Sequence, residues 1–265
     1  ENLSNNADNY TRFIIVTGKH VFEKDAKKVS ICFEVAHESG SLYHMLSHFI
    51  YNNLNMNRIE SRPIEDRNWE YRFFIDFDGT ICFDYFWRSA PDAFKQKFEP
   101  FLFRDNGNIV EDWMRGNLTS EQVCHFISEN RGLNYEDIFE IFVNDCETMI
   151  VKSEILMAID KCRKNNNVFL ITDNMDSFTR FTEPRLKLKQ HFDKIYNSAD
   201  YGKLKDDSTE ESLFTKALSD SNSDIKKSVL LDNSKRNCDI FKKLGGTSFC
   251  VESAEHVLTL LKMLE

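Results

Sequence analysis

Glycine is scarce in this chain, and basic residues are outnumbered by acidic ones. The 265 residues include 9 Gly, where average usage would give about 18, and this scarcity argues against flexible linkers. There are 34 Lys and Arg against 43 Asp and Glu, which gives a formal net charge of −9. Because nucleic-acid binding needs clustered Lys and Arg to neutralise phosphates, this balance argues against nucleic acid as a main partner.

Paired cysteines and long apolar runs are also missing. The seven cysteines are scattered, with no Cys-x-x-Cys pair, and an odd, unclustered set is typical of free thiols in a reducing compartment. No apolar run approaches the roughly 20 residues of a membrane span. The polar start ENLSNNADN does not resemble a signal peptide. These absences predict a cytoplasmic protein without a membrane partner.

The most informative stretch is YRFFIDFDGT, residues 71–80. Its aromatic and β-branched residues favour a buried strand, and its Asp-Gly step favours the turn that ends the strand. Asp76 and Asp78 therefore follow the strand where the backbone turns toward solvent, which is the edge where open α/β sheets bind ligands. Two carboxylates on one short turn repel each other, so they would favour a bound cation.

Strands alternate with helices in the C-terminal part of the chain. Apolar runs that end in polar residues predict strands at 167–174, 227–234 and 247–251. This alternation predicts an α/β fold with a doubly wound parallel sheet and helices on both faces. The segment after Thr80 is helical in pattern instead. There, Thr119 and Gln122 form a capping-box pattern, and Gly132 is typical of a helix end.

The DxDGT pattern and the acidic strand ends that follow it resemble haloacid-dehalogenase-like (HAD) phosphatases. The resemblance covers residues 71–265 and implies a Rossmann-like core with an inserted helical cap. It implies Asp76 as a nucleophile that forms an aspartyl-phosphate, and Asp78 as the general acid and base. Dehalogenases of this superfamily lack the second aspartate, so Asp78 favours phosphoryl transfer over carbon–halogen cleavage.

The same resemblance implies two substrate-binding residues. Thr172, at the end of a predicted strand, would hydrogen-bond a phosphoryl oxygen. A lysine would supply positive charge against the aspartyl-phosphate. Relatives place this lysine about three residues after a glycine, which from Gly202 selects Lys205 over Lys203 and leaves both as candidates.

The implied cofactor is Mg²⁺. Its ligands would be a carboxylate of Asp76, the backbone carbonyl of Asp78 and a carboxylate of Asp232, because hard oxygen ligands suit this ion. Two neighbours depart from the family pattern. Asn233 stands where many relatives have a second acid, and Asp173 stands where many have asparagine.

A second resemblance covers the N-terminal part of the chain, residues 9–79. The segments GSLYHML, IESRP and WEYRFFIDFDG resemble the α+β ACT regulatory domain of prephenate dehydratases, although the last helix and strand of such a domain have no counterpart. In that family the first two of these segments bind phenylalanine at a homodimer interface. The positions implied as ligand contacts are Gly40, Leu42, Glu60, Ser61 and Arg62.

Two functions from different classes follow from these resemblances. The first is a Mg²⁺-dependent phosphatase that acts on a small phosphorylated metabolite, with hydrolysis and phosphomutase transfer both open. The alternative is a phenylalanine-sensing regulatory module. The predicted domains are a partial ACT-like segment with an N-terminal tail, 1–70, and a HAD-like domain, 71–265, whose core is 71–84 and 164–265 and whose helical cap is 85–163.

Both resemblances include the strand at 71–77. Each backbone N–H and C=O group can serve one ladder only, and an unpaired buried group costs about 1–3 kcal/mol. The larger core offers more apolar area, so we expect this strand to join the parallel sheet. The overlap at FFIDFDG is typical of a recombined or artificial fusion.

Deletion of residues 1–68 tests this division of the chain. We expect the remaining protein to fold and to keep phosphatase activity, because all predicted strands of the parallel sheet lie after the cut. Circular dichroism and a phosphate-release assay check the two expectations. An unfolded truncation product would show that the N-terminal segment is integral to the core.

Overall fold

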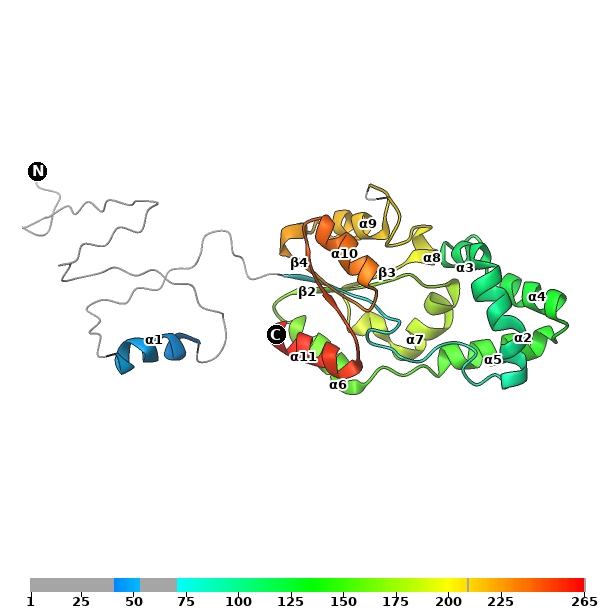
Figure 1. Cartoon of the computed structure of the whole chain (residues 1–265), viewed down its shortest axis with the longest axis horizontal. Helices are drawn as coiled ribbons and strands as arrows, with labels where there is room; N and C mark the ends of the chain where they lie inside the picture. Colours follow the sequence, from blue (N-terminus) through cyan, green and yellow to red (C-terminus); the bar gives the residue numbers. More distant parts are fainter. Residues whose placement is uncertain (1–40, 53–70, 209, 265) are drawn as a thin grey trace, which may run out of the picture. The chain divides into compact units, whose positions relative to one another are not determined.

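A computed structural model of the protein describes residues 41–52, 71–208 and 210–264. The chain divides into two units, Glu1–Pro63 and Ile64–Glu265. In the first unit the sequence predicts a helix from about residue 41 to 53, and the structure has α1 (Ser41–Tyr51) there (Figure 1). The sequence also predicts strands at 9–18, 29–36 and 58–64, and these lie outside the described residues. In the part of the chain that the structure describes, no helix is long and apolar enough to span a bilayer.

The second unit is built on a five-stranded parallel sheet. Its strands are β1 (Arg72–Ile75), β2 (Asn167–Thr172), β3 (Lys194–Asn197), β4 (Ser228–Asp232) and β5 (Thr247–Cys250). They lie in the order β3-β2-β1-β4-β5, so β1 is central. Phe74 is paired in register with Phe169 on one side and with Leu230 on the other. The α/β prediction is confirmed, and the strand that both resemblances share pairs with parallel strands on both sides.

Successive side chains of β1 lie on opposite faces of the sheet. Phe73 and Ile75 lie in one buried cluster, and Phe74 lies in another. Helices α6 (Ser153–Cys162) and α11 (Ala254–Leu264) cover the first face, and α9 (Leu213–Asp220) and α10 (Lys235–Lys243) cover the second (Figure 1). Because both faces are buried, the three central strands contain continuous apolar runs, at 73–75, 168–171 and 229–231.

Short helical segments connect β2 to β3 and β3 to β4. They are η2 (Phe178–Thr182), a π-helix; α7 (Glu183–Leu186); η3 (Leu188–Gln190), a 3₁₀ turn; α8 (Ser198–Tyr201); and η4 (Ile225–Lys227), a 3₁₀ turn. The sequence does not predict β3. This edge strand has four residues, of which Ile195 and Tyr196 are apolar, so its pattern is too short to recognise.

A helical insert lies between β1 and β2. It contains α2 (Asp92–Glu99), the π-helix η1 (Pro100–Asp105), α3 (Gly107–Met114), α4 (Ser120–Arg131) and α5 (Tyr135–Glu147). The predicted capping box of Thr119 and Gln122 is present, and Gly132 ends α4 in the left-handed conformation. The insert has its own aromatic core around Trp87, Trp113 and other buried rings. Helix α6 falls within the predicted cap range 85–163. Unlike the helices of the insert, it packs against the sheet.

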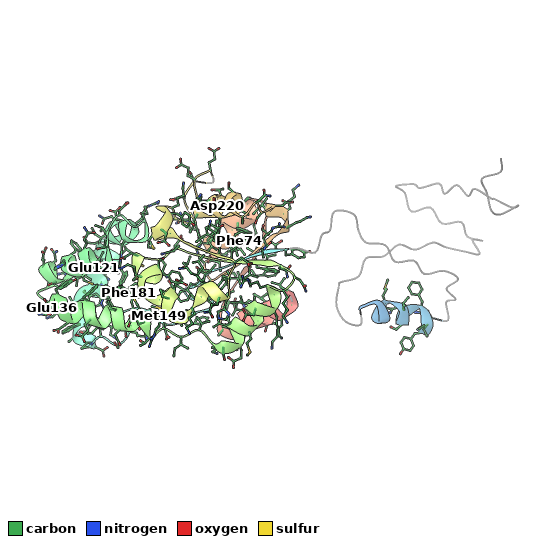
Figure 2. All side chains as sticks on the ribbon, turned by 180° about the vertical axis from the view of Figure 1, so that it is seen from behind. Phe74, Glu121, Glu136, Met149, Phe181 and Asp220 are labelled. Carbon is green, nitrogen blue, oxygen red and sulfur yellow. The ribbon has the colours of Figure 1, made fainter. Side chains whose placement is uncertain are left out.

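One polar junction ties the insert to the segment that follows β2. The Arg180 guanidinium donates to Glu121 at 2.6 and 2.9 Å and to Asp176 at 2.6 Å. Asp176 also accepts hydrogen bonds from the Trp113 indole and from the Ser120 hydroxyl, at 2.9 and 2.6 Å. Figure 2 places Glu121 in the insert, away from Phe74 in the sheet. Charge-assisted, bidentate contacts of this kind fix geometry.

Acid should weaken this junction through Glu121. Hydrogen bonds from Arg180 hold the pKa of Glu121 at about 2, below its ordinary value of 4.5. A carboxylate whose pKa is lowered by folding stabilises the folded state above its unfolded pKa. This contribution is lost as the pH falls from 4.5 toward 2.

We therefore expect Glu121→Gln to lower the melting temperature at pH 6, and the difference from the wild type to shrink as the pH falls below 4.5. Thermal unfolding at a series of pH values measures it. Glu136→Gln is the matched control, because Glu136 is an exposed glutamate in the first turn of another helix of the insert. A difference that stays constant with pH would contradict the assignment.

Candidate active site

Asp76 and Asp78 lie on a tight turn directly after β1. The N–H of Asp76 donates to the Leu231 carbonyl, and the Phe77 carbonyl accepts from the next residues of the turn. Gly79 adopts a φ of +67°, and a Cβ there would lie 2.1 Å from the side-chain nitrogen of Asn233. Glycine adopts this left-handed conformation without strain, and a larger residue would also have to displace the Asn233 side chain. The Asp-Gly step of the motif therefore suits the backbone of this turn.

Lys205 lies between two carboxylates at the carboxyl edge of the sheet. Its ammonium is 2.8 Å from Asp76 Oδ1 and 2.7 Å from Asp232 Oδ2, and all three side chains are buried. Lys203 points elsewhere and donates to the Glu211 carbonyl at 2.8 Å. Of the two candidate lysines, Lys205 is the one that contacts carboxylates at the ends of β1 and β4.

Burial and charge act in opposite directions on these groups. Burial raises the pKa of Asp76, and Lys205 lowers it in part. Burial alone would lower the pKa of Lys205, but Asp76 and Asp232 outweigh that effect and raise it. Burial likewise raises the pKa of Asp78 to about 6. One ammonium thus faces several carboxylates, and the surplus negative charge favours a cation at this edge.

Thr172 ends β2 beside these residues in the sheet order and is fully buried. Its hydroxyl makes no hydrogen bond within the described residues. A buried hydroxyl without a partner costs about 1–3 kcal/mol. An unsatisfied buried hydroxyl is consistent with the predicted contact to a phosphoryl oxygen, which stays a prediction.

Three polar residues of this edge are not predicted as site residues. The Asn174 amide donates to Asp78 Oδ2 at 2.8 Å, and the Asn237 amide lies 3.3 Å from both oxygens of Asp232. Asp173, noted in the sequence as a departure from the family pattern, accepts from the Lys205 N–H at 2.9 Å. The position of Asn174 two residues after the end of β2 is the one sequence signal that could have identified it.

The predicted magnesium ligands are hard oxygen donors, which suit that ion. Asp76 and Asp232 both contact Lys205, so their carboxylates converge, and Asp78 follows on the same turn. Within the described residues no group of three or more His, Cys, Asp or Glu is placed to hold a metal. The predicted set does not require one, since it consists of two carboxylates and one backbone carbonyl. Because position 233 is Asn233 and not an acid, this predicted site has one negative charge fewer than sites with a second acid there.

The implied regulatory contacts lie mostly outside the described residues. This holds for Gly40, Glu60, Ser61 and Arg62, while Leu42 is part of α1. Their predicted role in binding phenylalanine thus stays a prediction.

Solved structures with the same architecture are HAD-family proteins. A HAD-like family hydrolase from Porphyromonas gingivalis superposes with a TM-score of 0.61 at 18% identity, over 74% of this chain and 97% of that one. A HAD family enzyme from Bacteroides thetaiotaomicron, in complex with magnesium and inorganic phosphate, gives 0.58 at 19% identity, over 71% and 98%. At such identities the likeness establishes the fold, and it confirms the fold predicted for this part of the chain.

Curated relatives match a shorter stretch. Prephenate dehydratase of Methanocaldococcus jannaschii is 44% identical over 83 residues, which is 30% of each chain. A bifunctional chorismate mutase/prephenate dehydratase of Aquifex aeolicus is 37% identical over 78 residues, which is 29% of this chain and 22% of that protein. The chain thus spans less than a third of the length of these relatives. The predicted resemblance to prephenate dehydratases is confirmed, and no protein-family model matches the chain.

Proposed function

We propose that this chain, which has the fold of HAD-family hydrolases, is a Mg²⁺-dependent phosphatase that acts on a small phosphorylated metabolite. The observation that carries the proposal is the buried contact of Lys205 with Asp76 and Asp232. Asp78 lies on the same turn as Asp76, and the unpaired hydroxyl of Thr172 ends the neighbouring strand. These are the groups that phosphoryl transfer through an aspartyl-phosphate would need, and their common position at one sheet edge supports the proposal.

In the proposed reaction, a carboxylate oxygen of Asp76 attacks the phosphorus atom. The bond from phosphorus to the leaving oxygen breaks, and Asp78 gives that oxygen a proton. Asp78 then takes a proton from water, whose oxygen attacks the aspartyl-phosphate and releases inorganic phosphate and free Asp76. Burial raises the pKa of Asp78 to about 6, so this group exchanges protons readily near neutral pH.

The surrounding groups orient the reactants and offset their charge. Lys205 and Thr172 would bind the phosphoryl oxygens, and Asn174 holds the Asp78 carboxylate through its amide. The carboxylates of Asp76 and Asp232 and the carbonyl of Asp78 would hold Mg²⁺. When bound, this ion would neutralise charge on the transferring phosphoryl group. The magnesium and phosphate in the Bacteroides thetaiotaomicron enzyme support this assignment.

Asp76→Asn tests the mechanism. The substitution keeps the shape of the side chain but removes the nucleophilic carboxylate, so phosphate release from p-nitrophenyl phosphate should fall to the background of the assay. Activity of the wild type should require Mg²⁺ and be lost with EDTA. Circular dichroism establishes that the variant is folded. A folded variant that retains activity would exclude the aspartyl-phosphate route.

The two lysines provide a matched pair for the same assay. Lys205→Met removes the ammonium that would offset charge in the transition state, and kcat should fall about 10²–10³-fold. Lys203→Met should keep most of the activity, because that side chain contacts the Glu211 carbonyl and not the carboxylates. The reverse ranking of the two variants would reject the assignment of Lys205.

A second candidate function is binding of phenylalanine by the N-terminal segment. The observation that favours it is the identity of 44% over 83 residues to a prephenate dehydratase. The positions implied as contacts, such as Glu60 and Arg62, carry charges that could pair with the ammonium and carboxylate groups of a free amino acid.

Calorimetry with phenylalanine tests this function on the full chain. Binding should release measurable heat with L-phenylalanine, and Arg62→Ala should abolish the signal because it removes the predicted partner of the ligand carboxylate. D-Phenylalanine is the control ligand. An absence of heat at millimolar L-phenylalanine would leave the segment without a sensing role.

A further inference from the structure

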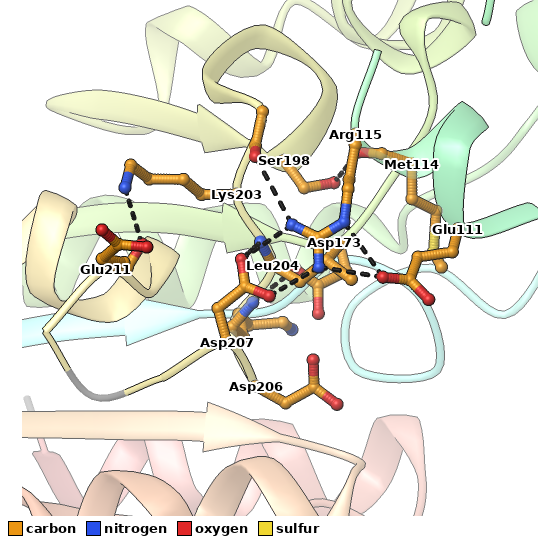
Figure 3. A network of polar contacts seen from close by, with 12 residues as sticks. Glu111, Met114, Arg115, Asp173, Ser198, Lys203, Leu204, Asp206, Asp207 and Glu211 are labelled. Carbon is orange, nitrogen blue, oxygen red and sulfur yellow. Dashed lines mark hydrogen bonds and ion pairs between the residues drawn. The ribbon is translucent and has the colours of Figure 1, made fainter. Parts of the chain in front are cut away.

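The carboxyl end of α3 holds the loop that carries Lys205. Arg115, the residue directly after α3, donates through both terminal nitrogens to the Asp207 carboxylate, at 2.9 and 2.6 Å. Glu111, one turn earlier, accepts from the same guanidinium at 3.0 and 2.9 Å. Figure 3 shows Arg115 between these two acids. A bidentate guanidinium–carboxylate pair fixes orientation as well as distance.

Asp207 connects Arg115 to the loop that carries Lys205. Its Oδ2 accepts from the N–H of Leu204 at 2.8 Å, which closes the loop around Lys205. The N–H of Lys205 donates to Asp173 at 2.9 Å, on the segment after β2. The Lys205 backbone is therefore held from two directions, by the insert through Asp207 and by the segment after β2 through Asp173.

The backbone of the insert contacts the same region. The Ser198 hydroxyl donates to the Met114 carbonyl at 2.7 Å. Gly116, with a φ of +71°, comes so near that a Cβ there would lie 2.3 Å from the Ala199 carbonyl oxygen. The side chains of Arg115 and Asp207 are 23% and 20% exposed. The ion pair is thus one part of a packed junction, not an isolated surface contact.

We propose that Arg115 is a positioning residue, which sets the place of the Lys205 ammonium from the helical insert. The proposal rests on the phosphatase function proposed above and adds a residue to it. Arg115 touches neither the nucleophile nor the acid. It acts through Asp207, which binds the loop that carries Lys205. The position of the insert and the position of the Lys205 ammonium therefore depend on each other.

Steady-state kinetics with p-nitrophenyl phosphate and Mg²⁺ test this role in Arg115→Ala, Asp207→Asn and the double variant. Loss of a supporting contact of this kind typically lowers activity about 10–100-fold, and kcat should change more than KM, because the lysine acts on the transferring group. The double variant should be no worse than the poorer single variant. Arg115→Lys, which keeps one donor, should be intermediate.

Arg104→Ala is the matched control, since Arg104 is an exposed arginine of the same insert that pairs with its neighbour Asp105. It should have wild-type kcat. Melting temperatures separate placement from folding: a merely structural Arg115 would lower stability but leave kcat per folded molecule unchanged. Unchanged kcat in Arg115→Ala, or additive losses in the double variant, would overturn the proposal.

Limited trypsin digestion gives a readout that does not need activity. Lys205 is buried and its loop is held at both ends, so native wild type should resist cleavage after Lys203 and Lys205. Arg115→Ala should be cut there about tenfold faster or more, and Arg104→Ala should match the wild type. Equal cleavage rates in Arg115→Ala and the wild type would show that Arg115 does not restrain the loop.

A wild type without phosphatase activity would reject the phosphatase function but not this restraint of the loop.

Discussion

The buried contact of one lysine with two aspartates is the interaction that the rest of this structure supports. Lys205 lies 2.8 Å from Asp76 and 2.7 Å from Asp232, with all three side chains buried. Burying charges costs free energy that their attraction need not repay, so such a cluster indicates a functional role more than a stabilising one. The rest of the fold maintains it. Parallel pairing brings the carboxyl ends of β1, β2 and β4 to one edge, and the apolar faces of the sheet hold these strands in register.

The strands of this edge could be predicted because an apolar run precedes Asp76 and others lead up to Thr172 and Asp232, which end β2 and β4. The run before Asp76 and the run before Asp232 each identify a buried strand, and parallel strands place their carboxyl ends together. The role predicted for Thr172 follows from the HAD resemblance and not from periodicity. The rule that buried backbone groups must pair predicts that the strand shared by both resemblances joins the larger core, and β1 does pair on both sides with strands of that core.

What the sequence could not reveal depends on side-chain direction and on contacts distant in the chain. Lys203 and Lys205 are two residues apart, and spacing alone could not show that one reaches the carboxylates while the other contacts Glu211. Arg115 and Asp207 are 92 positions apart, with nothing in either local pattern to link them. Asn174 was overlooked since an asparagine after a strand is common in turns.

The aromatic core of the insert has an optical consequence. Both tryptophans among the described residues, Trp87 and Trp113, are buried there, with exposed fractions of 1% and 0%. Trp113 also donates its indole N–H to Asp176, on the segment that follows β2. Indole emission depends on the polarity and hydrogen bonding around the ring. Any ligand that moves the insert relative to the sheet would therefore shift the emission maximum of the intrinsic tryptophan fluorescence. This emission thus reports the position of the insert without an added label.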